Sequence, residues 1–217
     1  MVELTKIHDA PSFDGAKVFF ASSGTEANEG ALKVARKVGK ERWAKATGKP
    51  SDDPSCDKYE IVCFEDGFHG RSMGALSVTS NPKYQAPFMP LIPGVRVGKF
   101  NNHETINDLV SEKTCAVIVE PIQGEGGIQS ARADWLKALR KKCDEVGAVL
   151  IFDEIQVCGS LRSPTRPSRI GRSALVLNSA DCTGPGTCGH TPRLVQTAGR
   201  ISSLWRNPWL MVIQSVL

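Results

Sequence analysis

Apolar residues in this chain gather into short runs, and the segments between the runs carry apolar residues at helical spacing. Three runs are almost wholly apolar, at Ile61–Phe64, Cys115–Val119 and Ala148–Phe152, and Lys17–Phe20 and Val95–Phe100 resemble them. Runs of this length without alternating polar residues predict strands that are buried on both faces.

The intervening segments predict helices. Ser23 and Glu26 stand at capping-box spacing, ahead of an apolar face that includes Ala27 and Ala31. Further helices are expected at His103–Lys113 and Asp134–Val146, and Gly67–Ser80 is expected to turn into a short one. The order predicts an α/β fold, with a mostly parallel sheet sandwiched by helices. Ligands of such sheets lie beyond the carboxyl ends of the strands.

The charge distribution changes abruptly after Gln156. Residues 157–217 contain no lysine, 7 arginines and a single acid, Asp181, and they are rich in Pro, Ser, Thr and Gly. We therefore predict two parts: 1–156 as part of a folded domain, and 157–217 as an unrelated basic tail. Because Val157-Cys158 can be encoded by the intron-donor sequence GTATGT, we interpret the tail as translated intron or out-of-frame sequence. The alternative is a basic, loosely folded tail of a real isoform.

Charge and hydropathy exclude some classes of partner. The net charge of +4 is too balanced to predict nucleic acid or an anionic membrane as the main partner. No apolar run approaches the roughly 20 residues that span a bilayer. Met1–Lys6 has neither a signal-peptide apolar region nor an Arg/Ser-rich transit stretch, so the chain as given is expected in the cytoplasm.

Polar groups follow four of the predicted strands. Ser23, Gly24 and Thr25 precede a helix, where free backbone N–H groups and the helix dipole suit a phosphate. Taken alone, this segment is better explained as an ordinary helix cap. Phe68 and Arg71 belong to a glycine-flanked loop, in which the ring can stack on a flat cofactor and the guanidinium can bind a carboxylate. An ordinary turn explains that loop as well.

Carboxylates follow the other two strands. Glu120 and Glu125 lie on a Gly-rich loop, where they can meet a substrate ammonium, orient other side chains or simply be solvated. Asp153 ends the Ala148–Phe152 run, where a buried carboxylate needs a partner such as a protonated ring nitrogen. Gln156 follows within reach of a ring hydroxyl. A phosphate cradle, an aromatic plate and a carboxylate for a pyridinium together indicate pyridoxal 5'-phosphate. No metal site is expected.

Four ordered motifs carry a family resemblance, namely Ser23–Asn28, Phe68–Arg71, Glu120–Gly127 and Asp153–Gln156. From about Lys17 to Gln156 the chain resembles the class-III pyridoxal-phosphate aminotransferases. The resemblance implies part of the large domain of the fold-type-I architecture, a homodimer, small-molecule amino acid and 2-oxo acid substrates, and the mitochondrial matrix. It favours acetylornithine with 2-oxoglutarate, in arginine biosynthesis. Ornithine or 4-aminobutyrate donors are the alternative.

The resemblance also assigns roles to single residues. It implies that Ser23, Gly24 and Thr25 bind the phosphate, that Phe68 stacks on the pyridine, and that Asp153 and Gln156 contact the ring nitrogen and the ring hydroxyl. Arg71 would bind the substrate α-carboxylate, and Glu125 would help to sort the two substrates.

The sequence departs from the family in one respect that concerns catalysis. The family has a Schiff-base lysine after the Asp153 motif, whereas the last lysine here is Lys142. The small domain of the family is missing as well. We therefore expect no catalytic residue for the covalent step and no activity of this chain. A non-catalytic fragment that binds pyridoxal phosphate or another subunit is the alternative function.

Overall fold

The computed structural model describes residues 17–155, 174–179 and 209–213. Its centre is a seven-stranded sheet with the strand order β1-β9-β8-β7-β4-β2-β3. The strands are β1 (Lys17–Ala21), β2 (Glu60–Phe64), β3 (Val95–Gly98), β4 (Thr114–Val119), β7 (Val149–Glu154), β8 (Ala174–Ser179) and β9 (Trp209–Ile213). A second sheet pairs β5 (Ile122–Gln123) with β6 (Gln129–Ser130).

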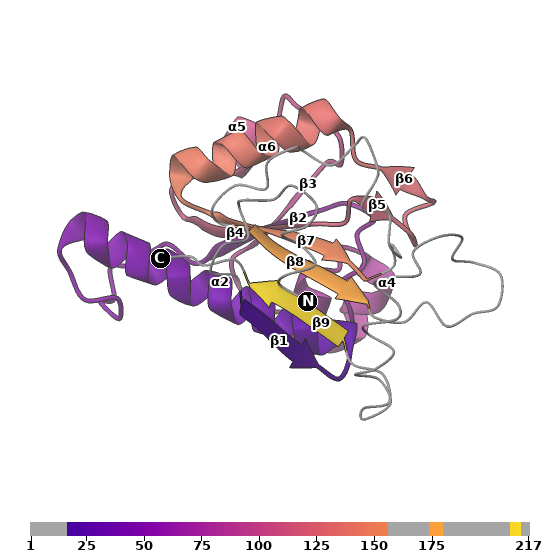
Figure 1. Cartoon of the computed structure of the whole chain (residues 1–217), viewed down its shortest axis with the longest axis horizontal. Coiled ribbons are helices and arrows are strands. Elements are labelled where there is room, and N and C mark those ends of the chain that lie inside the picture. Colours follow the sequence, from indigo (N-terminus) through magenta and orange to yellow (C-terminus); the bar gives the residue numbers. More distant parts are fainter. Residues whose placement is uncertain (1–16, 156–173, 180–208, 214–217) are drawn as a thin grey trace.

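The middle of the large sheet is parallel, as the apolar runs predict. β3, β2, β4, β7 and β8 pair in parallel with their neighbours, while β9 pairs antiparallel with both β8 and β1. Helices cover both faces of the sheet (Figure 1). This arrangement confirms the predicted α/β class.

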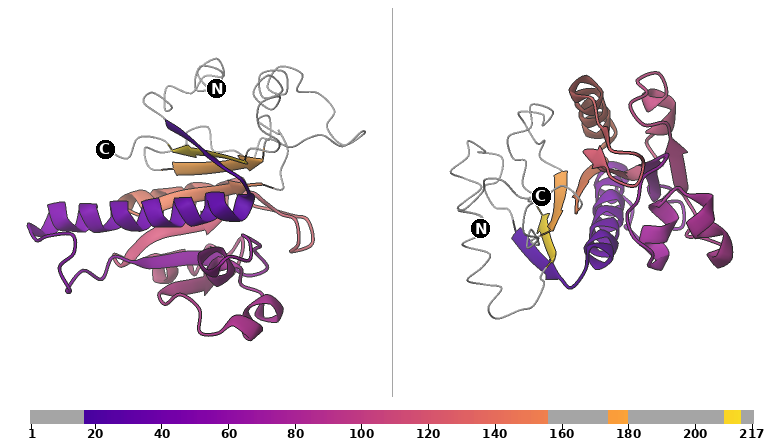
Figure 2. Two further views of the ribbon diagram at one scale, coloured as in Figure 1. Left: turned by 90° about the horizontal axis from the view of Figure 1, so that it is seen from below. Right: turned by 90° about the vertical axis from the view of Figure 1, so that its right-hand side faces the viewer.

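Each central strand divides its side chains between two cores. On one face, Val62, Val117 and Leu150 pack with Trp135 and Leu139 of α6 (Ala133–Val146). The alternate residues of the same strands pack on the opposite face against α2 (Gly24–Thr47), through residues that include Ala27, Ala31 and Leu32. Figure 2 shows the sheet between these helices. Burial on both faces explains why the strands read as continuous apolar runs.

Three shorter helices complete the described fold: α3 (Met73–Val78), α4 (Pro82–Gln85) and α5 (Ile106–Leu109), with a 3-10 turn η2 (Ala86–Phe88) after α4. The expected helix at His103–Lys113 is therefore shorter than predicted. Ile106 and Leu109 are buried and hold one turn, but the Ser111 amide donates to Thr114 Oγ1 at 3.0 Å and leads the chain into β4.

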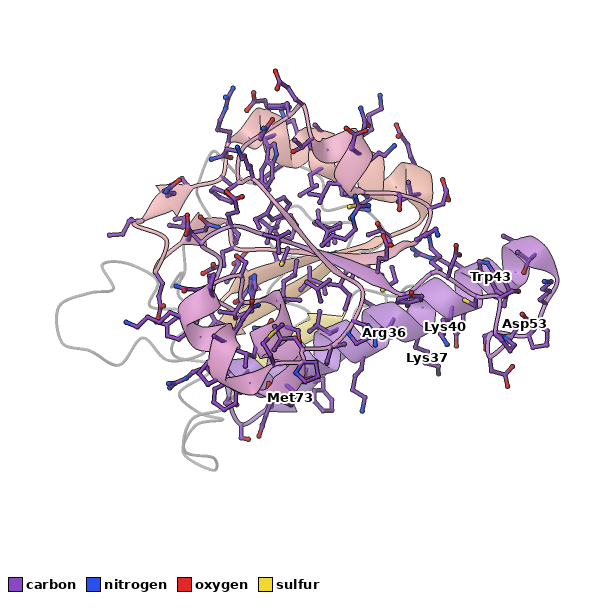
Figure 3. The ribbon with its side chains drawn as sticks, turned by 180° about the vertical axis from the view of Figure 1, so that it is seen from behind. Arg36, Lys37, Lys40, Trp43, Asp53 and Met73 are labelled. Atoms are coloured by element: carbon purple, nitrogen blue, oxygen red, sulfur yellow. The ribbon has the colours of Figure 1, made fainter. Side chains whose placement is uncertain are left out.

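The long helix α2 extends past the end of the sheet (Figures 1 and 3). Its distal part carries exposed polar side chains and Trp43, whose ring lies 5.9 Å from Lys49 Nζ. Gly48 ends the helix in the left-handed conformation, with φ at 72°. The buried half of the helix is the half next to its N-terminus, which therefore has a fixed position at the sheet edge.

The strands β8 and β9 come from the segment that the sequence analysis assigned to an unrelated tail. Their backbones continue the sheet beyond β7, whereas no element of the fold was expected after Gln156. Both are short apolar stretches, and such stretches satisfy their backbone groups by pairing with a sheet edge. The separate origin of residues 157–217 stays a prediction.

No helix in the described ranges is long and apolar enough to cross a membrane.

Candidate functional site

The candidate site lies at the carboxyl edge of the parallel strands. β2 ends at Phe64, β4 at Val119 and β7 at Glu154. The segments after β2 and β7 contact the start of α2, and the loop after β4 contacts the loop after β2. Carboxyl ends of neighbouring parallel strands share one edge of the sheet, which brings side chains distant in sequence together. The polar motifs of the sequence are therefore collected here.

Asp153 is a buried carboxylate of this edge, with 4% of its surface exposed. Its Oδ2 accepts hydrogen bonds from Asn28 Nδ2 at 2.9 Å and pairs with His69 Nδ1 at 2.8 Å. Its Oδ1 accepts from the Ile155 amide at 3.1 Å. Asn28 also donates to the His69 carbonyl at 2.6 Å. These contacts supply the partners that a buried carboxylate needs and fix its orientation.

The start of α2 lies beside the loop that follows β2. Ser23 caps the helix, accepting from the Glu26 amide at 3.3 Å, so the Gly24 and Thr25 amides belong to the first turn and cannot have partners within the helix. Thr25 Oγ1 lies 2.8 Å from Ser72 Oγ. Ser72 and the Gly74 amide both donate to Glu29 at 2.6 Å, which ties α3 to α2.

Two glycines allow this close approach. Gly70 has φ at 124°, and a Cβ there would overlap the Thr25 hydroxyl. A Cβ on Gly24 would come within 2.6 Å of the Ile155 side chain, next to the end of β7. The Gly70 position therefore favours glycine for contact and for conformation, whereas the Gly24 position favours it for contact.

Glu120 holds the loop that carries Phe68. Its Oε2 accepts from the Phe68 amide at 2.9 Å, and 3% of the residue is exposed. Burial raises the pKa of the Glu120 carboxyl to about 7, although the nearby His69 acts in the opposite direction. Glu120 is therefore a group that titrates near neutral pH inside the site.

Phe68, Tyr84 and Glu125 form the more exposed side of the site. The Phe68 and Tyr84 rings make an edge-to-face contact with centroids 5.8 Å apart, and Tyr84 donates to Glu125 Oε2 at 3.0 Å. Hydrogen bonding to the Glu125 carboxylate raises the pKa of the Tyr84 hydroxyl, while the charge of Arg71 acts to lower it. Arg71 itself is exposed.

The structure thus brings the predicted residues Ser23, Gly24, Thr25, Phe68, Arg71, Glu125 and Asp153 to one edge of the sheet through shared neighbours. Gln156 lies outside the described residues. Asn28, His69 and Tyr84 were not predicted from the sequence as partners of these residues. Asn28 had one available signal, because an amide on the apolar face of a predicted helix implies a buried hydrogen bond.

Comparison with known proteins identifies the class. The sequence model of the family "Aminotransferase class-III" matches residues 2–164. The chain belongs to the class-III aminotransferase family. This family consists of enzymes that depend on pyridoxal phosphate, as the motifs predicted.

Single relatives show how similar the chain is to named members of this family. The mitochondrial acetylornithine aminotransferase of Yarrowia lipolytica is 62% identical over 143 residues, 66% of this chain and 31% of that protein. Succinylornithine transaminase of Yersinia pseudotuberculosis is 38% identical over 219 residues, 90% of this chain and 52% of that protein. The crystal structure of N-acetylornithine aminotransferase from Stenotrophomonas maltophilia superposes with a TM-score of 0.59 at 26% identity, covering 100% of this chain and 46% of that one. The chain spans about a third of the length of the first curated relatives.

The donors and acceptors at the edge fit pyridoxal phosphate in their chemistry. The first-turn amides of α2, which have no partner within the helix, and the neighbouring Ser23 and Thr25 hydroxyls suit its phosphate. The half-buried Phe68 ring suits its pyridine. Asp153 is held by its neighbours as a hydrogen-bond acceptor, which suits a protonated ring nitrogen.

Proposed function

We propose that this chain is the cofactor-binding part of an aminotransferase and that its sheet edge holds pyridoxal phosphate. The observation that carries the proposal is the buried Asp153, fixed by Asn28 and His69 at the end of β7 and close to the start of α2. Burying a carboxylate costs free energy. A buried carboxylate that its neighbours hold by several hydrogen bonds is therefore expected to bind a cationic group of a ligand.

Each residue has one task in this proposal. Ser23, Gly24 and Thr25 bind the phosphate, Phe68 covers one face of the pyridine, and Asp153 keeps the ring nitrogen protonated. Gln156 contacts the ring hydroxyl. When bound, the cofactor supplies an electron-accepting ring for chemistry at the substrate's amino-bearing carbon. Glu120, Asn28 and His69 position these groups without contacting the substrate.

The proposed substrates are acetylornithine as amino donor and 2-oxoglutarate as acceptor. The proposal rests on the names of relatives at 52–62% identity, which include fungal and bacterial acetylornithine aminotransferases. Arg71 binds the α-carboxylate and Glu125 helps to distinguish the two substrates. A succinylornithine or other ω-amino donor is the second candidate, because the Yersinia relative is named for succinylornithine.

The 217 residues as given are proposed to be inactive in transamination. No lysine follows Asp153, so these residues lack the lysine that the family uses for the covalent cofactor link and for proton transfer. Borohydride treatment of the chain with pyridoxal phosphate, followed by peptide mass spectrometry, is expected to find no uniquely labelled lysine. A single stoichiometrically labelled lysine would contradict this proposal.

The boundary after Gln156 is proposed from the charge distribution. Alignments run past it, since the family match ends at residue 164 and the Yersinia match covers 90% of the chain. Comparing the transcript with the genome tests the boundary directly. An intron beginning at the Val157 codon supports separate origin, whereas a continuous exon through this codon contradicts it.

Assembly and location are proposed from the family. Active sites at the interface of a homodimer are its expected arrangement, and the mitochondrion is the expected compartment because several relatives are named mitochondrial. Sedimentation of the purified chain tests the dimer. Microscopy of the complete gene product tests its location.

Titration of pyridoxal phosphate with the purified chain tests the central proposal. We expect Asp153→Ala to weaken binding by at least tenfold, because the ring nitrogen loses a charge-assisted hydrogen bond of about 1.5–3 kcal/mol. The matched control is Asp52→Ala, which removes an exposed carboxylate from the loop after α2. Equal affinities of both variants would contradict the proposed site.

A further inference from the structure

Tyr84 lies among three residues to which the proposed function gives a task. Its ring contacts Phe68, its hydroxyl donates to Glu125, and its pKa responds to the charge of Arg71. None of the four sequence motifs contains this tyrosine. Its position therefore calls for a role that those motifs do not supply.

The short helix α4 holds Tyr84 in place. Asn81 caps the helix by accepting from the Lys83 amide at 3.0 Å, and its carbonyl accepts from the Tyr84 amide at 3.0 Å. Gln85 donates to the Leu76 carbonyl at 3.2 Å and so fastens α4 to α3. Tyr84 is half-buried, and its hydroxyl is bound to the Glu125 carboxylate.

Glu125 and Arg71 are of opposite charge, and both lie close enough to Tyr84 to influence its titration. Both side chains are exposed. Among the described residues, however, Arg71 forms no ion pair, and Glu125 is bound to Tyr84 instead. An arginine already paired with Glu125 would be a poor receptor for a substrate carboxylate.

We propose that Tyr84 is a positioning residue that holds the Glu125 carboxylate and thereby keeps Arg71 open for the carboxylate of a dicarboxylic substrate. The inference rests on the proposed function, because it assumes that Arg71 binds that carboxylate. Loss of the Tyr84 hydroxyl frees Glu125 to compete for Arg71. Substrate affinity then falls although every charged residue is still present.

The contact itself is testable without any ligand. The chain has two tyrosines, so Tyr59→Phe leaves Tyr84 as its only one. In this background the tyrosinate absorbance reports Tyr84, while circular dichroism verifies that the chain stays folded. We expect Glu125→Gln to lower the pKa of Tyr84 toward the ordinary value of about 10 and Arg71→Gln to raise it. The matched control Glu104→Gln removes an exposed glutamate near α5 and is expected to change nothing.

If alkali unfolds the chain, nuclear magnetic resonance of the Tyr84 ring carbons at neutral pH tests the contact between Tyr84 and Glu125 instead. A shift on Glu125→Gln that is absent in Glu104→Gln supports the contact. Identical spectra of Tyr84 in the parent and in Glu125→Gln would overturn the inference.

The consequence for Arg71 is tested by the affinity of 2-oxoglutarate for the chain saturated with pyridoxal phosphate. We expect Tyr84→Phe to weaken this affinity about tenfold, the size of one charge-assisted contact, with no change in the affinity of pyridoxal phosphate. Adding Glu125→Gln to Tyr84→Phe is expected to restore most of the loss, because a neutral amide does not compete for Arg71. A merely structural role of Tyr84 would not be rescued in this way.

The outcomes separate the inference from the proposed function. If Arg71→Gln leaves 2-oxoglutarate affinity unchanged, the proposed role of Arg71 fails and the inference falls with it. If Arg71→Gln weakens binding while Tyr84→Phe does not, or if the double variant shows no recovery, the inference alone is overturned.

Discussion

The hydrogen-bond partners of single residues at the carboxyl edge are harder to predict from sequence than the residues themselves. Asp153 was predictable from sequence because a carboxylate directly after an apolar strand needs a partner. Its partners Asn28 and His69 were not, because they approach from α2 and from the loop after β2, at sequence separations of 125 and 84 residues. Only the packing of α2 on the sheet determines which polar side chain of that helix reaches Asp153.

Asn28→Ala is expected to destabilise the chain by about 2 kcal/mol, because Asp153 and the His69 carbonyl both lose a buried donor. Urea denaturation measures this change. Asn107→Ala, at an exposed position on α5, is the control and should change stability by less than about 0.5 kcal/mol. Similar stabilities of the two variants would contradict the importance of this hydrogen-bond network.

Glu120 predicts a pH dependence of stability. Because burial raises the pKa of this carboxyl from 4.5 to about 7, the folded chain binds its proton more tightly than the unfolded chain. Its contribution to stability is therefore complete below about pH 4.5 and is lost as the pH rises through 7.

Glu120→Gln removes this titration and keeps an oxygen acceptor for the Phe68 amide. We expect the variant to be more stable than the parent by about 1–2 kcal/mol at pH 8, with a much smaller difference at pH 5. Unfolding in urea at the two pH values measures both. A difference that does not change with pH would show that Glu120 is ionised throughout.

At the scale of elements, the strands and long helices follow from the hydrophobic pattern, whereas the short helices do not. The runs at Ile61–Phe64 and Cys115–Val119 coincide with β2 and β4 to within one residue. α4 has only four residues and no apolar period, and it depends on the Asn81 cap and on Gln85. The sequence pattern consequently did not predict that Tyr84 belongs to the site.

The loop after β2 contacts the start of α2. Because of this contact, we expect alanine substitutions at two glycines to differ in their effects on stability and on cofactor binding. Gly70 and Gly127 both have positive φ, at 124° and 94°, but a Cβ on Gly70 meets Thr25 whereas one on Gly127 meets nothing within 4 Å. Gly70→Ala is expected to cost about 1–2 kcal/mol more stability than Gly127→Ala and to weaken pyridoxal phosphate binding. Equal effects on both properties would mean that backbone strain alone matters at Gly70.

At the scale of the whole molecule, the described residues place the proposed cofactor-binding edge on a sheet whose central strands are parallel. The α/β class and the cofactor followed from sequence because four motifs fall at strand ends in order. The pairing of β8 and β9 with the sheet did not, since proline, glycine and arginine dominate the composition around them. Short apolar stretches within such a segment carry little periodicity, so they indicate an element only weakly.

The most direct test is amide chemical-shift mapping of the chain during addition of pyridoxal phosphate. We expect the largest changes on Gly24, Thr25, Phe68 and Asp153, with further changes on Asn28 and His69. We also expect that Asp153→Ala abolishes these changes at the same concentration. Changes confined to the opposite edge of the sheet, or saturation with these four residues unmoved, would contradict the proposed site.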